Sequence, residues 1–167
     1  MILKDDPKAY AIMGCAMRVH KELGFGFLES AYGDALEIEF EKARIPYERE
    51  DEVRIYYDGK PLDTTYRADF TCFHREYIVE LKAIRTLSKI EWAQVIHYMR
   101  ATRIKYALLI NFGREQIQYD TFDLDKLPAT SVLDTRPTAT KSQPQAASSQ
   151  SVECECTMRS SDNSAER

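Results

Sequence analysis

The sequence has no run of apolar residues approaching the ~20 that a membrane-spanning helix requires. Its first residues also lack the basic segment followed by an apolar stretch that marks a secretory signal. Apolar residues make up 44% of the 167 residues and charged residues 30%, which is the balance of a soluble globular protein. These absences predict a cytoplasmic protein without a membrane partner.

Cysteine is scarce, and its placement does not suggest a disulfide framework. Cys15 and Cys72 stand among apolar neighbours in a predicted helix and a predicted strand, where a buried free thiol is ordinary. Cys154 and Cys156 form a C-x-C pair without the second ligand pair that a structural zinc site needs. The cysteines therefore predict neither disulfides nor bound zinc.

An excess of positive charge is missing as well. The net charge is −4, and residues 1–127 hold 19 basic and 22 acidic side chains. Proteins that bind nucleic acid as stable structural partners are usually basic. This balance disfavours that class, but it is compatible with an enzyme that contacts its substrate briefly through a local basic patch.

The composition changes near Pro128, which divides the chain into two parts. Residues 128–167 are mainly Ser, Thr, Ala, Gln and Pro with scattered charges. Such a segment cannot bury enough apolar surface to offset the entropy of ordering it. The sequence predicts one folded domain over residues 1–127 and a disordered tail over residues 128–167.

Capping signals and hydrophobic periodicity indicate the elements of that domain. Asp5 or Asp6 can cap a first helix that ends at Gly24, and Ser88 with Glu91 forms a capping box for a later one. The predicted order is α-α-β-β-β-α-β-β, an α/β fold in which a mixed sheet is flanked by helices. Helices are expected over residues 7–23, 28–43 and 88–101, and strands over residues 53–57, 65–73, 77–84, 105–111 and 115–122.

The strand expected at residues 77–84 is the most informative segment. Side chains alternate across a strand, so Glu80 and Lys82 project from one face while their apolar neighbours pack on the other. If the preceding strand pairs with it as a hairpin, Asp69 lies near Glu80. A surface ion pair on a half-exposed sheet is the simpler explanation. Charged residues on a buried strand, however, are usually paired or bound to metal.

This group of residues has a clear chemical use. Two carboxylates and a backbone carbonyl, such as that of Leu81, can hold Mg²⁺ and leave positions open for water and a phosphate oxygen. An adjacent lysine can orient the attacking water and stabilise negative charge on the phosphate. The pattern alone also arises by chance in mixed sheets.

Further segments make the pattern more specific. Residues 26–32 match G-x-x-E-x-x-Y, and residues 66–70, 78–83 and 108–113 follow in the same order as in the bacterial and archaeal GxxExxY family. The chain resembles that family over nearly all of residues 7–123. The family is placed in the PD-(D/E)xK nuclease superfamily, so the resemblance implies a restriction-endonuclease-like core.

The resemblance also implies roles for individual residues. Asp69 and Glu80 would be metal ligands, Lys82 the catalytic lysine, and Glu29 an acid that approaches the metal directly or through water. Ala68 stands where many members have a proline, and that departure leaves the role of Asp69 intact. An acid in the first turn of a helix is also favoured by the helix dipole, so a purely structural role for Glu29 stays open.

The helix expected after the lysine strand contributes further candidates. Gln94 and Tyr98 match the Q-x-x-x-Y pattern of RecB-like members, and a spacing of four puts both on one helix face. Gln94 is a candidate catalytic residue, although it could simply be a structural hydrogen-bonding residue. The candidates for contacts with nucleic acid are Tyr98, Arg67, Arg85, Lys89 and Arg100. Each of the four cations is more simply explained as a solvated charge.

The favoured function is a Mg²⁺-dependent phosphodiesterase, with Mn²⁺ as a substitute, that acts transiently on DNA, with RNA as the second candidate substrate. The alternative is a non-catalytic module that keeps the nuclease fold and binds nucleic acid or protein, which the acidic net charge favours. Hydrolysis of another phosphate ester is a third possibility. Binding of a divalent cation through Asp69 and Glu80 would separate the enzyme from the module.

Overall fold

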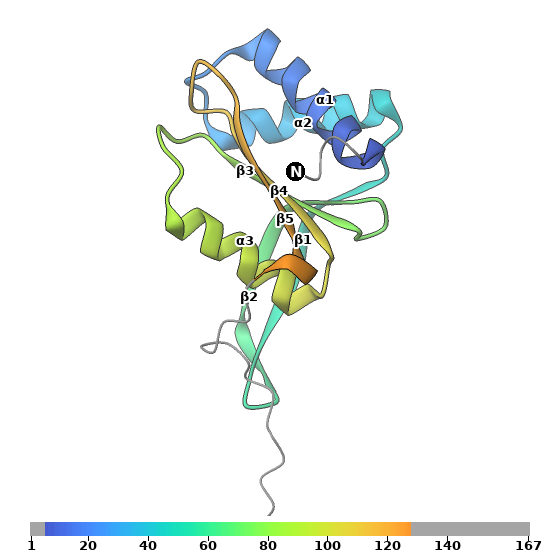
Figure 1. Cartoon of the computed structure of the whole chain (residues 1–167), viewed down its shortest axis with the longest axis vertical. Coiled ribbons are helices and arrows are strands. Elements are labelled where there is room, and N and C mark those ends of the chain that lie inside the picture. The colour runs from blue at the N-terminus through green and yellow to red at the C-terminus, as the bar shows by residue number, and fades with distance from the viewer. Residues whose placement is uncertain (1–5, 128–167) are drawn as a thin grey trace, which may run out of the picture. The chain divides into compact units, whose positions relative to one another are not determined.

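The computed structural model describes residues 6–127, and the predicted tail over residues 128–167 lies outside this range. The order of elements is the predicted one (Figure 1). In this part of the chain no helix is both long and apolar enough to span a membrane. The elements are α1 (Pro7–Leu23), α2 (Glu29–Ala43), β1 (Tyr47–Tyr57), β2 (Lys60–Cys72), β3 (Tyr77–Lys82), α3 (Lys89–Thr102), β4 (Tyr106–Asn111), β5 (Gln118–Asp123) and the short 3-10 helix η2 (Leu124–Lys126).

The five strands form one mixed sheet in the order β1-β2-β3-β4-β5. All neighbouring strands are antiparallel except β3 and β4, which are parallel. A parallel pair needs a crossover connection, and α3 supplies it. This confirms the predicted α/β fold with a mixed sheet and helices.

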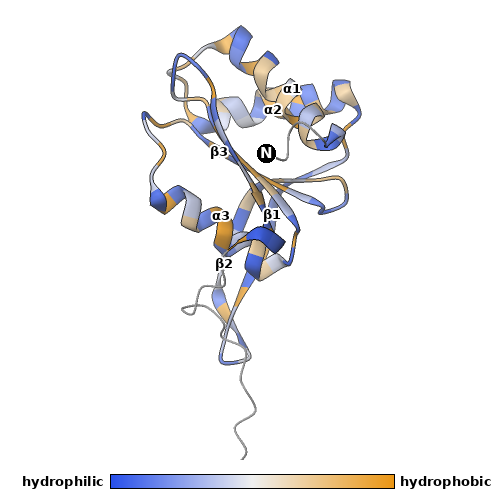
Figure 2. Ribbon diagram, viewed as in Figure 1, coloured by the Kyte–Doolittle hydropathy of each residue, from blue (hydrophilic) through white to orange (hydrophobic). Residues whose placement is uncertain are grey.

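Two hydrophobic cores cover the two faces of the sheet. Val79 and Leu81 of β3 pack with α1 and α2, whereas Ile78 packs with α3. The alternation of side chains therefore places Glu80 and Lys82 on the same face as α3. Hydrophobic and hydrophilic segments alternate along the helices in Figure 2, as expected for helices with one buried side.

Local capping fixes the helix ends where the sequence predicts them. The Asp6 carboxylate accepts from the Lys8 and Ala9 backbone N–H groups, and Gly24 ends α1 with a positive φ of 68°. Ser88 and Glu91 form the predicted capping box at the start of α3. These ends match because the bonds involved are local in sequence.

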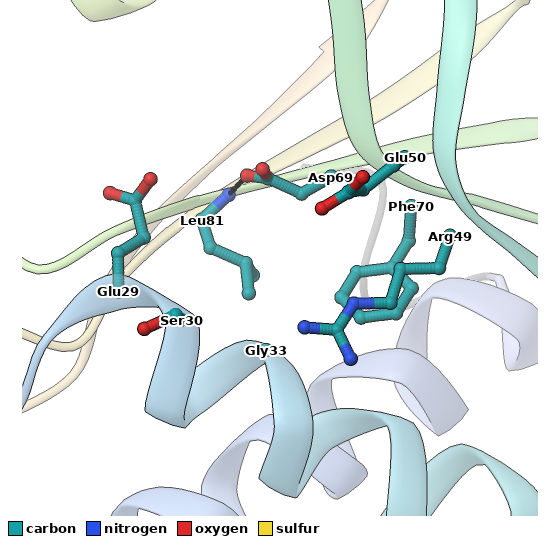
Figure 3. Close-up of a pocket in the computed structure, with 8 residues that line it drawn as sticks. All are labelled: Glu29, Ser30, Gly33, Arg49, Glu50, Asp69, Phe70 and Leu81. Atoms are coloured by element: carbon teal, nitrogen blue, oxygen red, sulfur yellow. Dashed lines mark hydrogen bonds between the residues drawn. The ribbon is translucent and has the colours of Figure 1, made fainter.

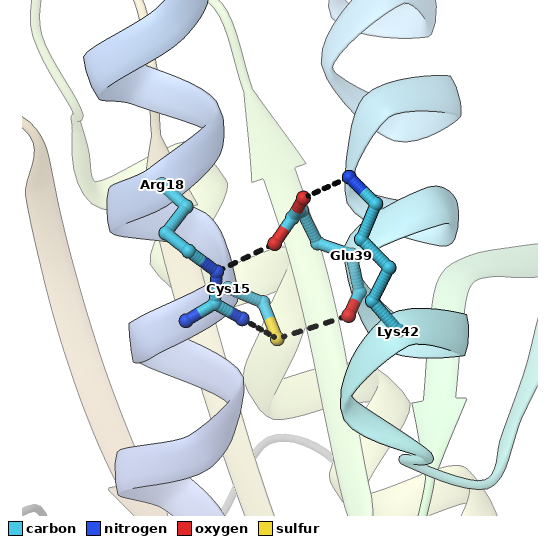
Figure 4. Close-up of polar contacts among 4 residues, drawn as sticks. All are labelled: Cys15, Arg18, Glu39 and Lys42. Atoms are coloured by element: carbon cyan, nitrogen blue, oxygen red, sulfur yellow. Dashed lines mark hydrogen bonds and ion pairs between the residues drawn. The ribbon is translucent and has the colours of Figure 1, made fainter.

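Polar contacts also join α1 to α2 (Figure 4). The Glu39 carboxylate binds Arg18 at 2.5 Å and Lys42 at 2.8 Å, and Arg18 donates to the Cys15 sulfur. Burial raises the pKa of Cys15, so its thiol stays protonated. Cys15 and Cys72 are both buried and free, as predicted.

The first two strands are longer than the sequence predicts. β1 begins at Tyr47, and it pairs with β2 up to Cys72. The segment is rich in charge, which hides a strand from pattern analysis. It is strand because Tyr47 packs its ring against Phe40 and Phe70 and because its backbone pairs with β2.

Gly113 follows β4 and lies against the backbone of Ile84, which the Asn111 side chain holds through two hydrogen bonds. An added methyl group at Gly113 would overlap that backbone. Gly113→Ala is therefore expected to lower the free energy of unfolding by about 1–3 kcal/mol. Gly14→Ala, in the open interior of α1, is expected to raise it by about 0.5–1 kcal/mol. Urea denaturation of both variants measures this, and equal effects would contradict the close approach at Gly113.

Candidate functional site

The site begins where β2 separates from β3. Backbone pairing between the two strands covers only Phe70–Val79, Thr71–Ile78 and Cys72–Tyr77. Beyond that point the Asp69 side chain takes the place of the missing strand, and its Oδ2 accepts from the Leu81 N–H at 2.7 Å (Figure 3). The Asp69 carboxylate is thereby fixed at the open edge of β3.

Glu29 reaches the same edge from the first residue of α2 (Figure 3). Burial raises its pKa, while Lys82 and the backbone N–H of Ala83 favour its charged form. Within one β-strand residue the N–H and C=O point toward the same edge. The Leu81 carbonyl therefore faces the edge at which Asp69 and Glu29 are bound, as expected for a metal ligand supplied by the backbone.

Glu80 lies beside this edge, on the face of the sheet that α3 covers, and is only 1% exposed. Its Oε1 accepts from Lys82 Nζ and from Gln94 Nε2, both at 2.8 Å. Its Oε2 is buried and has no hydrogen-bond partner among residues 6–127. Burial, together with the charge of Asp69, raises the pKa of Glu80 to about 7.

Lys82 is the cation of this group. Burial lowers its pKa, but the charges of Glu80, Glu29 and Asp69 outweigh that effect and raise it overall. The lysine therefore stays protonated. The three acids that raise its pKa are the three that the sequence predicts for the site. Within the described residues no three His, Cys, Asp or Glu side chains are already gathered closely enough to enclose an ion.

Gln94 and Tyr98 lie on the same face of α3, as their spacing predicts. Gln94 Nε2 also contacts the Tyr98 hydroxyl at 2.9 Å. Tyr98 is 2% exposed and packs edge-on against the Tyr66 ring. In this arrangement Tyr98 orients Gln94 toward Glu80 and does not face solvent.

The remaining predicted residues lie outside the acidic group. Arg67 forms ion pairs with Glu50 and Glu52 on β1. The exposed side chains of Arg85 and Lys89 lie near the start of α3, and Arg100 is half-buried near its end.

The structure adds two residues that sequence reasoning missed, Arg49 and Glu50. Both line a pocket with Asp69 and Glu29 (Figure 3). Glu50 on β1 and Asp69 on β2 both lie between the paired positions Arg49–Phe70 and Asp51–Ala68. Glu50 has a left-handed backbone with a φ of 52°. Positions of this kind cluster at functional sites. Only the run of charges at residues 48–52 hinted at them.

Glu80→Gln is expected to remove a pH dependence from the stability of the metal-free protein. Between about pH 4.5 and 7, folded Glu80 keeps a proton that the unfolded chain releases, so its contribution to stability falls as pH rises through that window. The shift corresponds to about 3 kcal/mol at most. Melting temperatures in EDTA at pH 5 and pH 8 test this. The same pH slope in the variant and the wild type would show that Glu80 titrates normally.

We compared the chain with protein families, curated proteins and solved structures. A solved structure titled "Crystal structure of SSO0001" shares 14% sequence identity with a TM-score of 0.43, over 67% of this chain. The chain spans about 65% of the length of that structure. The curated proteins contain no match. The family model described as the PD-(D/E)XK nuclease superfamily matches residues 6–121, so the chain belongs to the PD-(D/E)XK nuclease superfamily.

Proposed function

We propose that this protein is a metal-dependent nuclease that hydrolyses phosphodiester bonds of DNA or RNA. The observation that carries the proposal is the open edge of β3. Two acids from separate elements, Asp69 and Glu29, are bound to its backbone, with Glu80 and Lys82 alongside. Membership of a nuclease superfamily supports the same chemistry.

The donor set suits a hard divalent cation such as Mg²⁺, for which Mn²⁺ can substitute. The buried Glu80 Oε2 lacks a hydrogen-bond partner in the described part of the chain, and a bare carboxylate oxygen of this kind is costly unless a ligand satisfies it. Asp69, Glu80 and the Leu81 carbonyl would hold the cation, with Glu29 as a direct or water-mediated ligand. When bound, the cation supplies positive charge that polarises a phosphate oxygen and makes water a better nucleophile.

The chain's own residues then have separate tasks. The Lys82 ammonium orients the attacking water and stabilises negative charge as the new P–O bond forms and the old one breaks. Gln94 holds Glu80 in place through its amide N–H. Hydrolysis consumes one water, whose hydroxyl stays on phosphorus and whose proton reaches the leaving oxygen.

We also propose that the chain belongs to the GxxExxY group within the superfamily. Tyr32 of that motif donates to the Gly24 carbonyl at 2.9 Å and accepts from the Phe27 N–H at 3.3 Å. Its ring stacks on Phe112 with centroids 4.6 Å apart. The motif tyrosine therefore fixes the loop that leads into Glu29, which explains why the motif contains both residues.

The test combines metal binding with cleavage. Titration calorimetry of the full chain with Mn²⁺ is expected to show a saturable site, and plasmid DNA or a structured RNA is expected to be cut only with Mg²⁺ or Mn²⁺ present. If the protein binds no divalent cation and cuts neither substrate, a non-catalytic module replaces the nuclease. The acidic net charge already favours that alternative over a tight structural binder of duplex DNA.

A further inference from the structure

The loop that leads into Glu29 exposes large apolar side chains. Phe25 is 59% exposed, Phe27 is 52% exposed and Leu28 is 79% exposed. They lie one to four residues before Glu29, on the rim of the site described above. Tyr32 holds this loop in place, and the Phe27 ring packs edge-on against it at 6.3 Å. The rings are therefore presented on a supported loop.

Two other loops meet this one at the same end of the parallel strands. The loop after β4 is tied to the loop after β3, because the Asn111 side chain bonds both backbone groups of Ile84. It is also tied to α1, because His20 Nε2 lies 2.9 Å from the Arg114 carbonyl oxygen. The rim thus consists of the three connections at residues 24–28, 83–88 and 112–117, together with Lys89 at the start of α3.

Cations accompany the apolar side chains on this rim. Arg85, Lys89 and Arg114 are all exposed. Within residues 6–127 none of the three lies within ion-pair distance of a carboxylate. The rim therefore combines exposed aromatic rings with cations available to phosphate groups.

We propose that this rim, which we call the aromatic rim (Phe25, Phe27 and Leu28 with Arg85, Lys89 and Arg114), binds unpaired nucleotides, so that the substrate is single-stranded nucleic acid. This inference rests on the proposed nuclease function. Stacking of bases on aromatic side chains, with cations along the backbone, is how proteins bind single strands. In a duplex the base faces are already stacked on one another and cannot use Phe25 or Phe27.

The charge of the protein supports the same choice. Binding to duplex DNA depends chiefly on many phosphate contacts, and this chain has a net charge of −4. Three cations on the rim are few for a duplex. Stacking of bases adds affinity without requiring a basic protein. The stacking residues Phe25 and Phe27 lie four and two residues before Glu29, an acid of the site.

The test measures binding without cleavage. Fluorescence anisotropy of the full chain in EDTA, with a labelled single-stranded oligonucleotide and with its duplex, is expected to give about tenfold tighter binding of the single strand. The double variant Phe25→Ser/Phe27→Ser is expected to weaken single-strand binding by about tenfold or more. Binding to the duplex should change by less than about twofold, because its bases do not stack on the rim.

The control is Tyr56→Ser/Tyr57→Ser. These tyrosines are 57% and 67% exposed, at the turn between β1 and β2, which is at the opposite end of the described domain from the start of α2 (Figure 1). This variant is expected to bind the single strand as the wild type does. Equal loss in both variants, or equal affinity for single strand and duplex, would overturn the proposal.

Two other outcomes separate this inference from its alternatives. If gel filtration shows a wild-type dimer that Phe25→Ser/Phe27→Ser dissociates while binding to the oligonucleotide is unchanged, the loop is a contact between copies and the inference is wrong. If the single strand binds through the rim but no metal supports cleavage, the rim is a binding site for unpaired nucleotides and the proposed nuclease function fails. If the protein cleaves single strands and duplexes equally well, the inference is wrong and the proposed nuclease function stands.

Discussion

Asp69→Asn is expected to abolish both divalent-metal binding and cleavage. The asparagine side-chain oxygen can still accept from the Leu81 N–H, so the edge of β3 keeps its structure. In the proposed site, what is lost is the negative charge that would hold the cation. We expect Mn²⁺ affinity to fall by about 100-fold or more and cleavage by about 10³-fold or more. Calorimetry and a plasmid-nicking assay measure the two losses on the same preparation.

Glu52→Gln is the matched control for this change. Glu52 is an exposed carboxylate on β1 whose contact in the described residues is a long ion pair with Arg67 at 3.9 Å. Its replacement is expected to leave metal affinity and cleavage within about twofold. An Asp69→Asn protein that still binds Mn²⁺ with wild-type affinity would remove Asp69 from the metal site.

Local chemistry explains why much of the fold could be predicted. The helix ends at Asp6, Gly24 and Ser88 depend on bonds between residues two to four positions apart, which sequence patterns display directly. The common face of Glu80 and Lys82 follows from strand alternation alone. Those features needed no knowledge of distant contacts.

The features that escaped prediction depend on tertiary packing. The early start of β1 is fixed by rings from α2 and β2 that pack on Tyr47. The left-handed backbone of Glu50 and the departure of Asp69 from regular pairing occur where β2 separates from β3. No short motif encodes that separation, so Arg49 and Glu50 could not be placed beside the site from sequence.

The candidate site was only partly predictable for a related reason. Sequence reasoning can group acids by strand face, but it cannot tell which side chain bonds which backbone group. The arrangement at the open edge of β3 requires α2 to bring Glu29 to the strand, and that depends on the stack of Tyr32 on Phe112.

Lys82→Ala is expected to reduce cleavage by about 10³-fold while leaving the metal site intact. In the proposed mechanism the ammonium acts on water and on the charge of the transition state, and it does not coordinate the cation. Its removal also takes away a positive charge beside the carboxylates, so Mn²⁺ should bind as tightly as in the wild type or slightly more tightly. The measurements are single-turnover cleavage of a labelled oligonucleotide and calorimetry with Mn²⁺.

The pH of that comparison matters because Lys82 helps to keep Glu80 charged. Without the lysine, the pKa of Glu80 should rise further above about 7, and protons would then compete with the cation. Calorimetry at pH 8 or above limits this competition. Lys105→Ala, which removes an exposed lysine paired with Asp125, is the control and should cut normally. If Lys82→Ala cuts as fast as this control, the carboxylate site stands and the lysine is not its catalytic cation.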